Sequence, residues 1–140
     1  MFQIYLVNIT VIAMAVGIHY EVLYRLSIMM PKLPIRYRYR VLVGIIGAFF
    51  AHSVEVWLFA FTYYFVIGSG KFGGINGIDH PDLMDFVYFS FVNYTTLGYG
   101  DITPYGLVRF TAGLEALTGL LLIAWTASFM YYEIRKYWEG

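Results

Sequence analysis

Three long apolar stretches constrain the fold of this chain more than any other feature. They cover residues 2–30, 41–67 and 107–132, which are 29, 27 and 26 residues long. A helix rises about 1.5 Å per residue and the hydrocarbon core of a bilayer is about 30 Å thick, so each stretch can cross a membrane. Of the 140 residues, 60% are hydrophobic and 13% are charged, which is unusual for a soluble domain. We therefore expect a multi-pass, all-α membrane protein.

The positions of the basic residues predict the orientation of these helices. Four Lys or Arg residues lie in the linker 31–40, and Arg135 and Lys136 follow the third stretch, whereas no basic residue precedes Arg25. Because cytoplasmic loops carry the excess of Lys and Arg, we expect the linker and the tail 133–140 to be cytoplasmic and the N-terminus to be outside. We interpret the basic linker as an anchor that contacts anionic lipid. A prokaryotic plasma membrane is the expected location.

The charge balance and the absence of cysteine exclude several kinds of function. Nine basic and nine acidic residues give a net charge of zero, which offers no support for a nucleic acid partner. The chain has no cysteine, which excludes disulfides, cysteine metal sites and thiol catalysis. We expect the three histidines to lie at different depths, and no nucleophile is paired with a base. We therefore do not expect an enzyme.

The segment between the second and third stretches divides into three parts. Residues 68–80 form a glycine-rich polar loop, residues 81–95 are mostly apolar and aromatic, and residues 96–101 are polar. The loop ends in Asp79-His80-Pro81-Asp82, where a capping residue, a proline and carboxylates indicate the start of a helix. The 15 residues of 81–95 are too few to cross a bilayer. We expect this helix to enter the membrane from outside and to stop at mid-depth.

The run Thr96-Leu97-Gly98-Tyr99-Gly100-Asp101 has the composition of an ion filter. A filter replaces the water around a cation with backbone carbonyls that point at one axis, and the dihedral angles this requires favour glycine. Irregular backbone at membrane depth is tolerated only where it is buried in protein or lines a watery path. The run resembles the potassium channel signature Thr-Val-Gly-Tyr-Gly-Asp, with Leu97 where that family more often has Val or Ile.

The order of the segments also resembles the pore domain of that family. The family's order is outer helix, turret loop, pore helix, filter and inner helix, which correspond here to residues 41–67, 68–80, 81–95, 96–101 and 107–132. Residues 1–30 add one helix before this unit. The resemblance implies three transmembrane helices, a re-entrant pore helix and a filter loop, assembled as a homotetramer. It implies passive potassium conduction, with K⁺ as the permeant ion and no other cofactor. The alternatives are a non-selective cation channel and a non-conducting structural or regulatory subunit.

The same resemblance implies roles for residues in and around the filter. K⁺ would be coordinated by backbone carbonyls of the filter, formed by Thr96, Leu97, Gly98, Tyr99 and Gly100. Asp101 would lie at the outer mouth. Support from behind the filter would come from Thr95, Tyr88 and Phe89, the last two against the Tyr99 ring. Some family members carry a glutamate in the pore helix, and Val92 occupies that position here.

On the inner helix, helical periodicity separates two faces. Alignment from Asp101 without gaps turns one face toward the cavity, and that face carries Leu117, Leu121, Ala124 and Ser128. Glu115 lies on nearly the opposite face. Gly113 and Gly119 permit either close packing or a bend, and we favour packing.

Buried polar residues form the last candidate site. His52 and Glu55 lie three residues apart on one helix face, and Glu115 is expected at a similar depth on another helix. We expect His52, Glu55 and Glu115 to form a cluster behind the filter, acting either as a static clasp between helices, which we favour, or as a proton sensor. For His19, snorkelling or a contact between helices is a sufficient explanation.

The chain lacks the usual signals for two kinds of gating. No helix carries arginine at every third position, so we expect no voltage sensor. Only eight residues follow Tyr132, so we expect no cytoplasmic ligand-binding domain. Gating would then depend on the filter, the inner-helix crossing, protons, lipid or tension.

Overall fold

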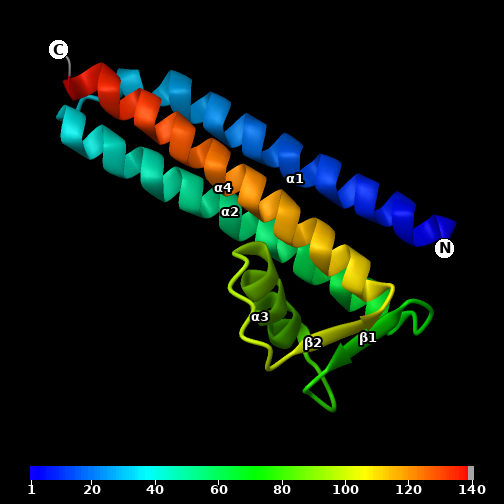
Figure 1. The fold of residues 1–140 in the computed structure, drawn as a ribbon. Helices are drawn as coiled ribbons and strands as arrows, with labels where there is room; N and C mark the ends of the chain where they lie inside the picture. Colours follow the sequence, from blue (N-terminus) through cyan, green and yellow to red (C-terminus); the bar gives the residue numbers. More distant parts are fainter. Residues whose placement is uncertain (139–140) are drawn as a thin grey trace.

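Three long helices lie side by side in the computed structural model, which describes residues 1–138 (Figure 1). They are α1 (Phe2–Met29), α2 (Tyr37–Gly68) and α4 (Val108–Trp138). Each is long and apolar enough to cross a membrane. The predicted fold class, an all-α membrane protein with three spanning helices, is confirmed. Helix α1 packs against both α2 and α4, with a short 3₁₀ helix η1 (Met30–Lys32) at its end.

Helices α2 and α4 are longer than predicted. Helix α2 begins at Tyr37 instead of residue 41, because arginine is a good helix former and only the prolines of the linker prevent helix. Helix α4 continues to Trp138, past the predicted end at residue 132, and Lys136 pairs with Glu133 at 2.8 Å within this extension. The predicted tail 133–140 is therefore mostly helical, and its residues 139–140 lie outside the described residues.

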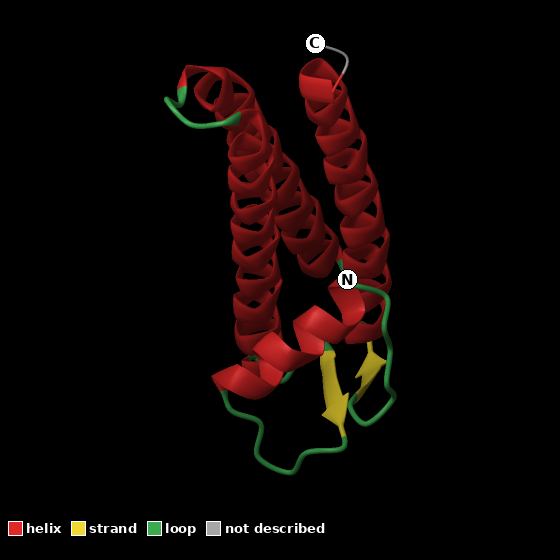
Figure 2. Ribbon diagram, turned by 90° about the vertical axis from the view of Figure 1, so that its left-hand side faces the viewer, coloured by secondary structure: helices red, strands yellow, loops and turns green. Residues whose placement is uncertain are grey.

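A short helix, α3 (Leu83–Tyr94), lies at one end of the long helices (Figure 2). It starts two residues later than predicted because Asp82, not Asp79, is its N-cap. The Asp82 side chain accepts from the Asp85 amide at 3.0 Å, and the Asp85 side chain accepts from the Asp82 amide at 2.8 Å. This reciprocal capping box fixes the first turn. At 12 residues, α3 is about 18 Å long and cannot span a bilayer.

Two short strands close the segment between α2 and α4. Strand β1 (Gly73–Asn76) pairs antiparallel with β2 (Thr103–Gly106), with Gly73 opposite Gly106. The sequence predicted only a loop here, because two adjacent glycines hide the strand pattern. Glycine is nevertheless required at residue 73, where φ is +105° and a Cβ atom would lie 2.3 Å from the Tyr105 carbonyl oxygen. The strand pair holds both ends of the segment together.

The C-terminus of α3 packs tightly against α4. A Cβ atom on Gly119 would lie 2.0 Å from the backbone oxygen of Tyr94, so only glycine allows this approach. The packing role that we favoured for Gly119 is confirmed, whereas nothing lies within 4 Å of a Cβ atom on Gly113. Tyr94 is thereby fixed beside α4, and the segment that follows it starts there.

Candidate functional site

The backbone of the predicted filter has a regular alternation. Left-handed φ angles occur at every second residue, with values of +59° at Thr96, +58° at Gly98 and +82° at Gly100. Alternating handedness turns successive carbonyl groups toward one side of the chain, which a β-strand does not do. The Gly98 amide donates to the Val92 carbonyl at 3.2 Å, and this bond ties the segment to α3. For Thr96 the left-handed conformation costs about 1–2 kcal/mol, so the surrounding structure must stabilise it.

The predicted filter is open along one side in the single chain. All residues from Thr95 to Asp101 are exposed, including Leu97 at 56% and Tyr99 at 70%. The segment returns beside α3 toward β2 (Figure 1). Thr95, predicted as support, donates its hydroxyl to the Phe91 carbonyl at 2.7 Å. One chain therefore presents the filter backbone on its surface.

Tyr88 and Phe89, the predicted support for Tyr99, each have another partner within one chain. The Tyr88 hydroxyl instead donates to Asp101 Oδ2 at 2.7 Å, and this hydrogen bond raises the pKa of Tyr88. Phe89 is buried and packs against Tyr63, with ring centroids 5.0 Å apart. The charged Asp101 is the stronger partner for the Tyr88 hydroxyl because hydrogen bonds to a carboxylate are stronger than neutral ones.

The predicted cavity face of α4 is also uncovered in the single chain. Its four residues are all exposed, namely Leu117, Leu121, Ala124 and Ser128. Glu115 is fully buried on the opposite side, together with Thr111 and Thr118. The partition of α4 into two faces therefore follows its helical periodicity.

Glu55 lies at the centre of a hydrogen-bonded network that joins four helices. Its Oε1 lies 2.9 Å from His19 Nδ1, and its Oε2 lies 3.2 Å from His52 Nδ1 and accepts from the Tyr94 hydroxyl. The far nitrogens of both histidines contact one hydroxyl, because Thr126 Oγ1 lies 2.9 Å from His52 Nε2 and 3.2 Å from His19 Nε2. We call these five residues the histidine network.

One prediction about these residues is wrong. The histidines were expected at different depths, but the rings of His19 and His52 have centroids 5.0 Å apart, because α1 packs beside α2. Glu115 was expected in a cluster with His52 and Glu55. Its partner on α3 is Ser90, one helical turn before Tyr94, which bonds to Glu55. For His19 the sequence left open snorkelling or a contact between helices and could not show which helix it faces.

Glu115 has its own partners behind α3. The Tyr63 hydroxyl donates to Glu115 Oε2 at 2.5 Å, and Ser90 Oγ contacts Glu115 Oε1. Ser90 also reaches the Val56 carbonyl oxygen at 2.8 Å. We call Glu115, Tyr63 and Ser90 the Glu115 group. It links α2, α3 and α4.

A metal ion is a poor match for the histidine network, although its spacing would admit one. Ligand atoms of His19, His52 and Glu55 all lie within 4.8 Å of one another. Each of these atoms already has a hydrogen-bond partner. A divalent ion beside a single carboxylate would also leave a net positive charge among apolar side chains, which is costly at membrane depth. We therefore interpret these residues as a hydrogen-bonded network.

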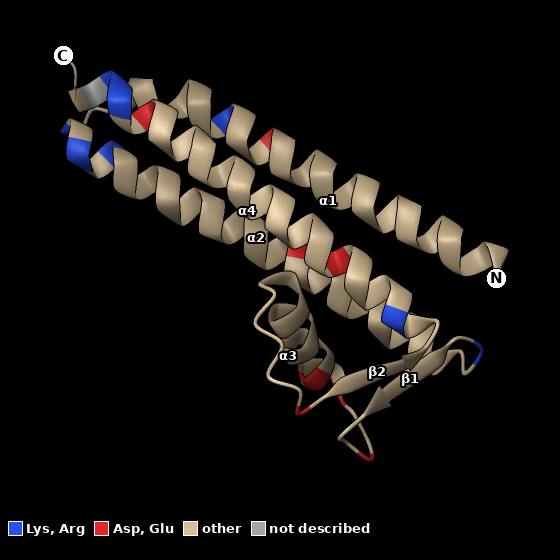
Figure 3. Ribbon diagram, viewed as in Figure 1, with Lys and Arg blue, Asp and Glu red and all other residues tan. Residues whose placement is uncertain are grey.

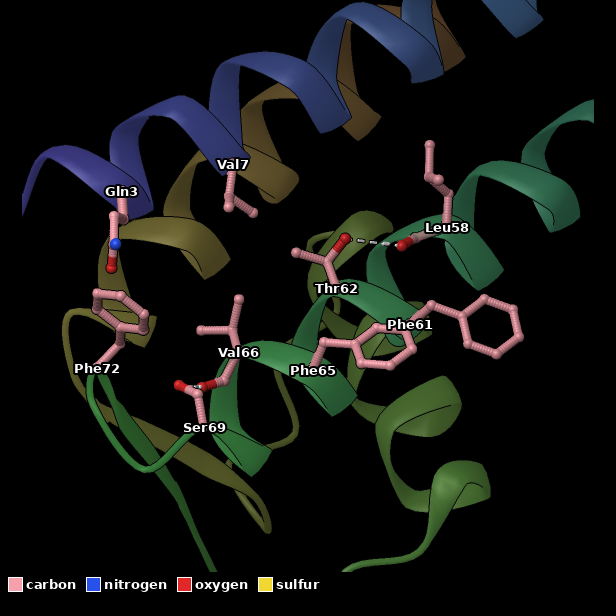
Figure 4. A pocket seen from close by; sticks show the side chains of 9 residues that line it. All are labelled: Gln3, Val7, Leu58, Phe61, Thr62, Phe65, Val66, Ser69 and Phe72. Carbon is pink, nitrogen blue, oxygen red and sulfur yellow. Dashed lines mark hydrogen bonds between the residues drawn. The ribbon is translucent and has the colours of Figure 1, made fainter.

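One groove lies away from all of these residues. A cavity of about 510 Å³ separates α1 from the later half of α2, and Figure 4 shows Gln3 and Val7 on one side and Leu58 and Phe65 on the other. Its hydroxyl groups bond to backbone, as the Thr62 hydroxyl does to the Leu58 carbonyl at 2.9 Å. No residue of α3, the predicted filter or α4 lines it. The groove is therefore not part of the candidate ion path.

Comparison with known families gives one result. The sequence model of a family described as ion channel matches residues 51–135, which is more than half of the 140 residues. The matched region contains α3, the predicted filter and most of α2 and α4, and it excludes α1. Comparison with curated proteins and with solved structures gives no match.

Proposed function

This chain belongs to the ion channel family, and we propose that it is a potassium-selective channel that conducts passively through a tetrameric pore. The observation that carries the proposal is the alternating backbone of residues 96–100, which directly follows a helix too short to cross a bilayer. In this arrangement the carbonyls of Thr96, Leu97, Gly98 and Tyr99 replace the hydration shell of K⁺. Irregular backbone at this depth is tolerated because it lines the ion path.

The exposed surfaces of the single chain support assembly around an axis. One filter segment supplies one wall of a pore, and four copies form a ring. The same assembly would cover the exposed filter side chains, including Tyr99, and would turn the face of α4 that carries Leu117 and Leu121 toward a central cavity.

The distribution of charge supports an orientation with the filter mouth outside. Figure 3 shows Lys and Arg concentrated where α2 begins and α4 ends, and Asp residues in the loops at the opposite end. Between α2 and the first turn of α4, four aspartates against Lys71 and Arg109 leave two excess negative charges per chain. In a tetramer these charges would concentrate cations at the entrance. The basic end would face the cytoplasm.

Flux measurements on purified protein in lipid vesicles test the proposal. We expect potassium-dependent dye uptake that is lost in Gly98→Ala, because φ at Gly98 is +58° and a side chain there is strained. Gly17→Ala is the matched control, because Gly17 is exposed on α1 with nothing within 4 Å of an added Cβ atom. Absence of flux from properly tetrameric protein would instead identify a non-conducting subunit.

A bi-ionic recording then tests selectivity. With Na⁺ on one side and K⁺ on the other, a selective filter gives a reversal potential far from zero. A reversal potential near zero would contradict potassium selectivity and would identify a non-selective cation channel.

A further inference from the structure

The histidine network lies where all the helices meet the start of the filter. His19 comes from α1, Glu55 and His52 from α2, Tyr94 from the end of α3 and Thr126 from α4. His19 and Glu55 are fully buried, and the His52 side chain is 20% exposed. A cavity of about 330 Å³ between α2 and α4 reaches His52 and Thr126. The network is thus enclosed by protein, and this cavity connects His52 and Thr126 to the surface of the chain.

The hydrogen-bond count in this network requires one proton beyond the neutral side chains. Six contacts need protons: His19 to Glu55, Tyr94 to Glu55, His52 Nδ1 to both Glu55 and the Tyr94 hydroxyl, and Thr126 to each histidine. One proton on His52 Nδ1 can serve both of its acceptors, so five protons fill all six contacts. Two neutral imidazoles, one phenol and one threonine hydroxyl supply four protons. The fifth proton completes every link and also cancels the charge of the Glu55 carboxylate.

We propose that the histidine network binds one proton that His19 and His52 share through the Thr126 hydroxyl, and that occupancy of this proton site is coupled to the filter through Tyr94. When His19 carries the proton, its Nε2 donates to Thr126, and the Thr126 hydroxyl donates to His52. Reversal of both bonds moves the proton to His52. No bond is left empty in either form, and the network stays electrically neutral.

Loss of the shared proton changes both bonding and charge. Four protons cannot fill all the contacts. Either Thr126 donates to one histidine and its link to the other is lost, or His52 donates from Nε2 to Thr126 and loses its bond to Glu55. The Glu55 carboxylate is left with an uncompensated charge at membrane depth, which is costly. The Tyr94 hydroxyl bonds to this carboxylate, and Tyr94 immediately precedes Thr95 and Thr96. A change in the network therefore reaches the first residues of the filter directly.

Other ionisable groups do not supply this proton. Glu115 is bonded to Tyr63 and to Ser90, which lies one helical turn before Tyr94 on α3. Glu21 and Arg25, on the same helix as His19, are exposed and pair with each other at 2.6 Å. The remaining ring beside His19 is Trp125, which does not titrate.

Nitrogen NMR on the full-length, histidine-labelled protein in lipid nanodiscs tests the shared proton. The chain has three histidines, and the exposed His80 supplies a reference signal from the same sample. As the pH is varied, we expect the ring nitrogens of His19 and His52 to change together, each reporting part of one proton. Two neutral rings, or two rings that titrate independently, would overturn the proposal.

Two substitutions at Thr126 form a matched pair for the relay. Thr126→Val keeps the shape and removes the hydroxyl, and we expect the signals of His19 and His52 to separate into one charged and one neutral ring. Thr126→Ser keeps the hydroxyl, and we expect the parent spectrum. Parent-like signals in the valine variant would show that Thr126 carries no proton between the rings and would overturn the proposal.

The coupling to the filter rests on the proposed function and is tested separately. We expect potassium flux to depend on pH in the parent and in Thr126→Ser, and this dependence to be lost in Thr126→Val. The same pH profile in all three proteins would overturn the coupling. Absence of flux at every pH would overturn the proposed function, whereas the NMR result on the proton site would stand by itself.

Discussion

At Glu115, hydrogen-bond geometry determines the protonation of a fully buried side chain. Ser90 Oγ lies near two oxygen atoms, the Val56 carbonyl at 2.8 Å and Glu115 Oε1. A serine hydroxyl has one proton and the carbonyl cannot donate, so both contacts are filled only when Glu115 is a neutral acid that donates to Ser90. Tyr63 donates to the other oxygen. Glu115 thus acts as a neutral link between α3 and α4 and needs no ion partner.

This reasoning predicts that Glu115→Gln is tolerated and Glu115→Ala is not. A glutamine amide can donate to Ser90 while its oxygen accepts from Tyr63, so every bond of the Glu115 group is kept. Alanine removes the acceptor of the buried Tyr63 hydroxyl and the side-chain partner of Ser90, at a cost of about 1–3 kcal/mol. Thermal unfolding of both variants in detergent measures the difference. If glutamine destabilises the protein as much as alanine does, Glu115 is ionised and the assignment is wrong.

At the scale of elements, α3 is fixed at both ends by different interactions. Its N-terminus is held by the capping box of Asp82 and Asp85, and its C-terminus by the Tyr94 hydroxyl and the close approach to Gly119. Between them, Ser90 bonds to α2 and to the Glu115 side chain. The start of the predicted filter is therefore positioned by packing on α4 as well as by hydrogen bonds.

The packing at Gly119 predicts a specific defect in Gly119→Ala. The added Cβ atom would overlap the Tyr94 backbone oxygen, which cannot move aside as a flexible side chain would. Overpacking of this kind costs about 1–3 kcal/mol and would shift the end of α3. We expect a lower unfolding temperature and a loss of ion selectivity in the bi-ionic recording. Gly113→Ala, on the same helix with nothing within 4 Å, should resemble the parent.

The capping box predicts a local effect at the other end of α3. Asp82→Ala removes the acceptor for the Asp85 amide and should cost about 1 kcal/mol, whereas Asp82→Asn keeps an acceptor. Hydrogen exchange of the first amides in α3 measures this effect. We expect faster exchange in the alanine variant only. If the amides of Asp82→Ala exchange as slowly as those of Asp82→Asn, the strand pair β1–β2, and not the cap, fixes the start of α3.

At the scale of the whole molecule, the features that the sequence predicted are those with a strong local signal. Apolar length located three helices, and the short apolar run with its aspartates located α3. Helix ends were less certain, because Arg38 and Arg40 interrupt an apolar pattern without interrupting a helix. The pairing of Gly73 with Gly106 joins residues far apart in the chain and has no local pattern. His19 was missed for the same reason, since its partner Glu55 lies 36 residues away.

The family match excludes α1, yet α1 completes the polar interior of this chain. His19 bonds to the buried Glu55, and Asn8 accepts from the Thr111 hydroxyl at 3.0 Å. Without α1, the buried Glu55 carboxylate loses one of its hydrogen-bond partners. Breaking a buried charged pair by removing one partner costs about 3–5 kcal/mol. The three helices therefore form one unit, although a two-helix pore unit is sufficient for the family resemblance.

A truncated chain of residues 31–140 tests this dependence. We expect it to fail to assemble, or to unfold at a clearly lower temperature than the full chain. Co-expression with a separate fragment of residues 1–34 should restore assembly, because the contacts of α1 with α2 and α4 do not need the linker to be continuous. The same fragment with His19→Ala should restore it less well, since it cannot pair with Glu55. Size-exclusion chromatography with light scattering measures assembly in each case. If the truncated chain assembles and unfolds like the full one, α1 is a peripheral addition and the histidine of α1 does not stabilise the carboxylate of α2.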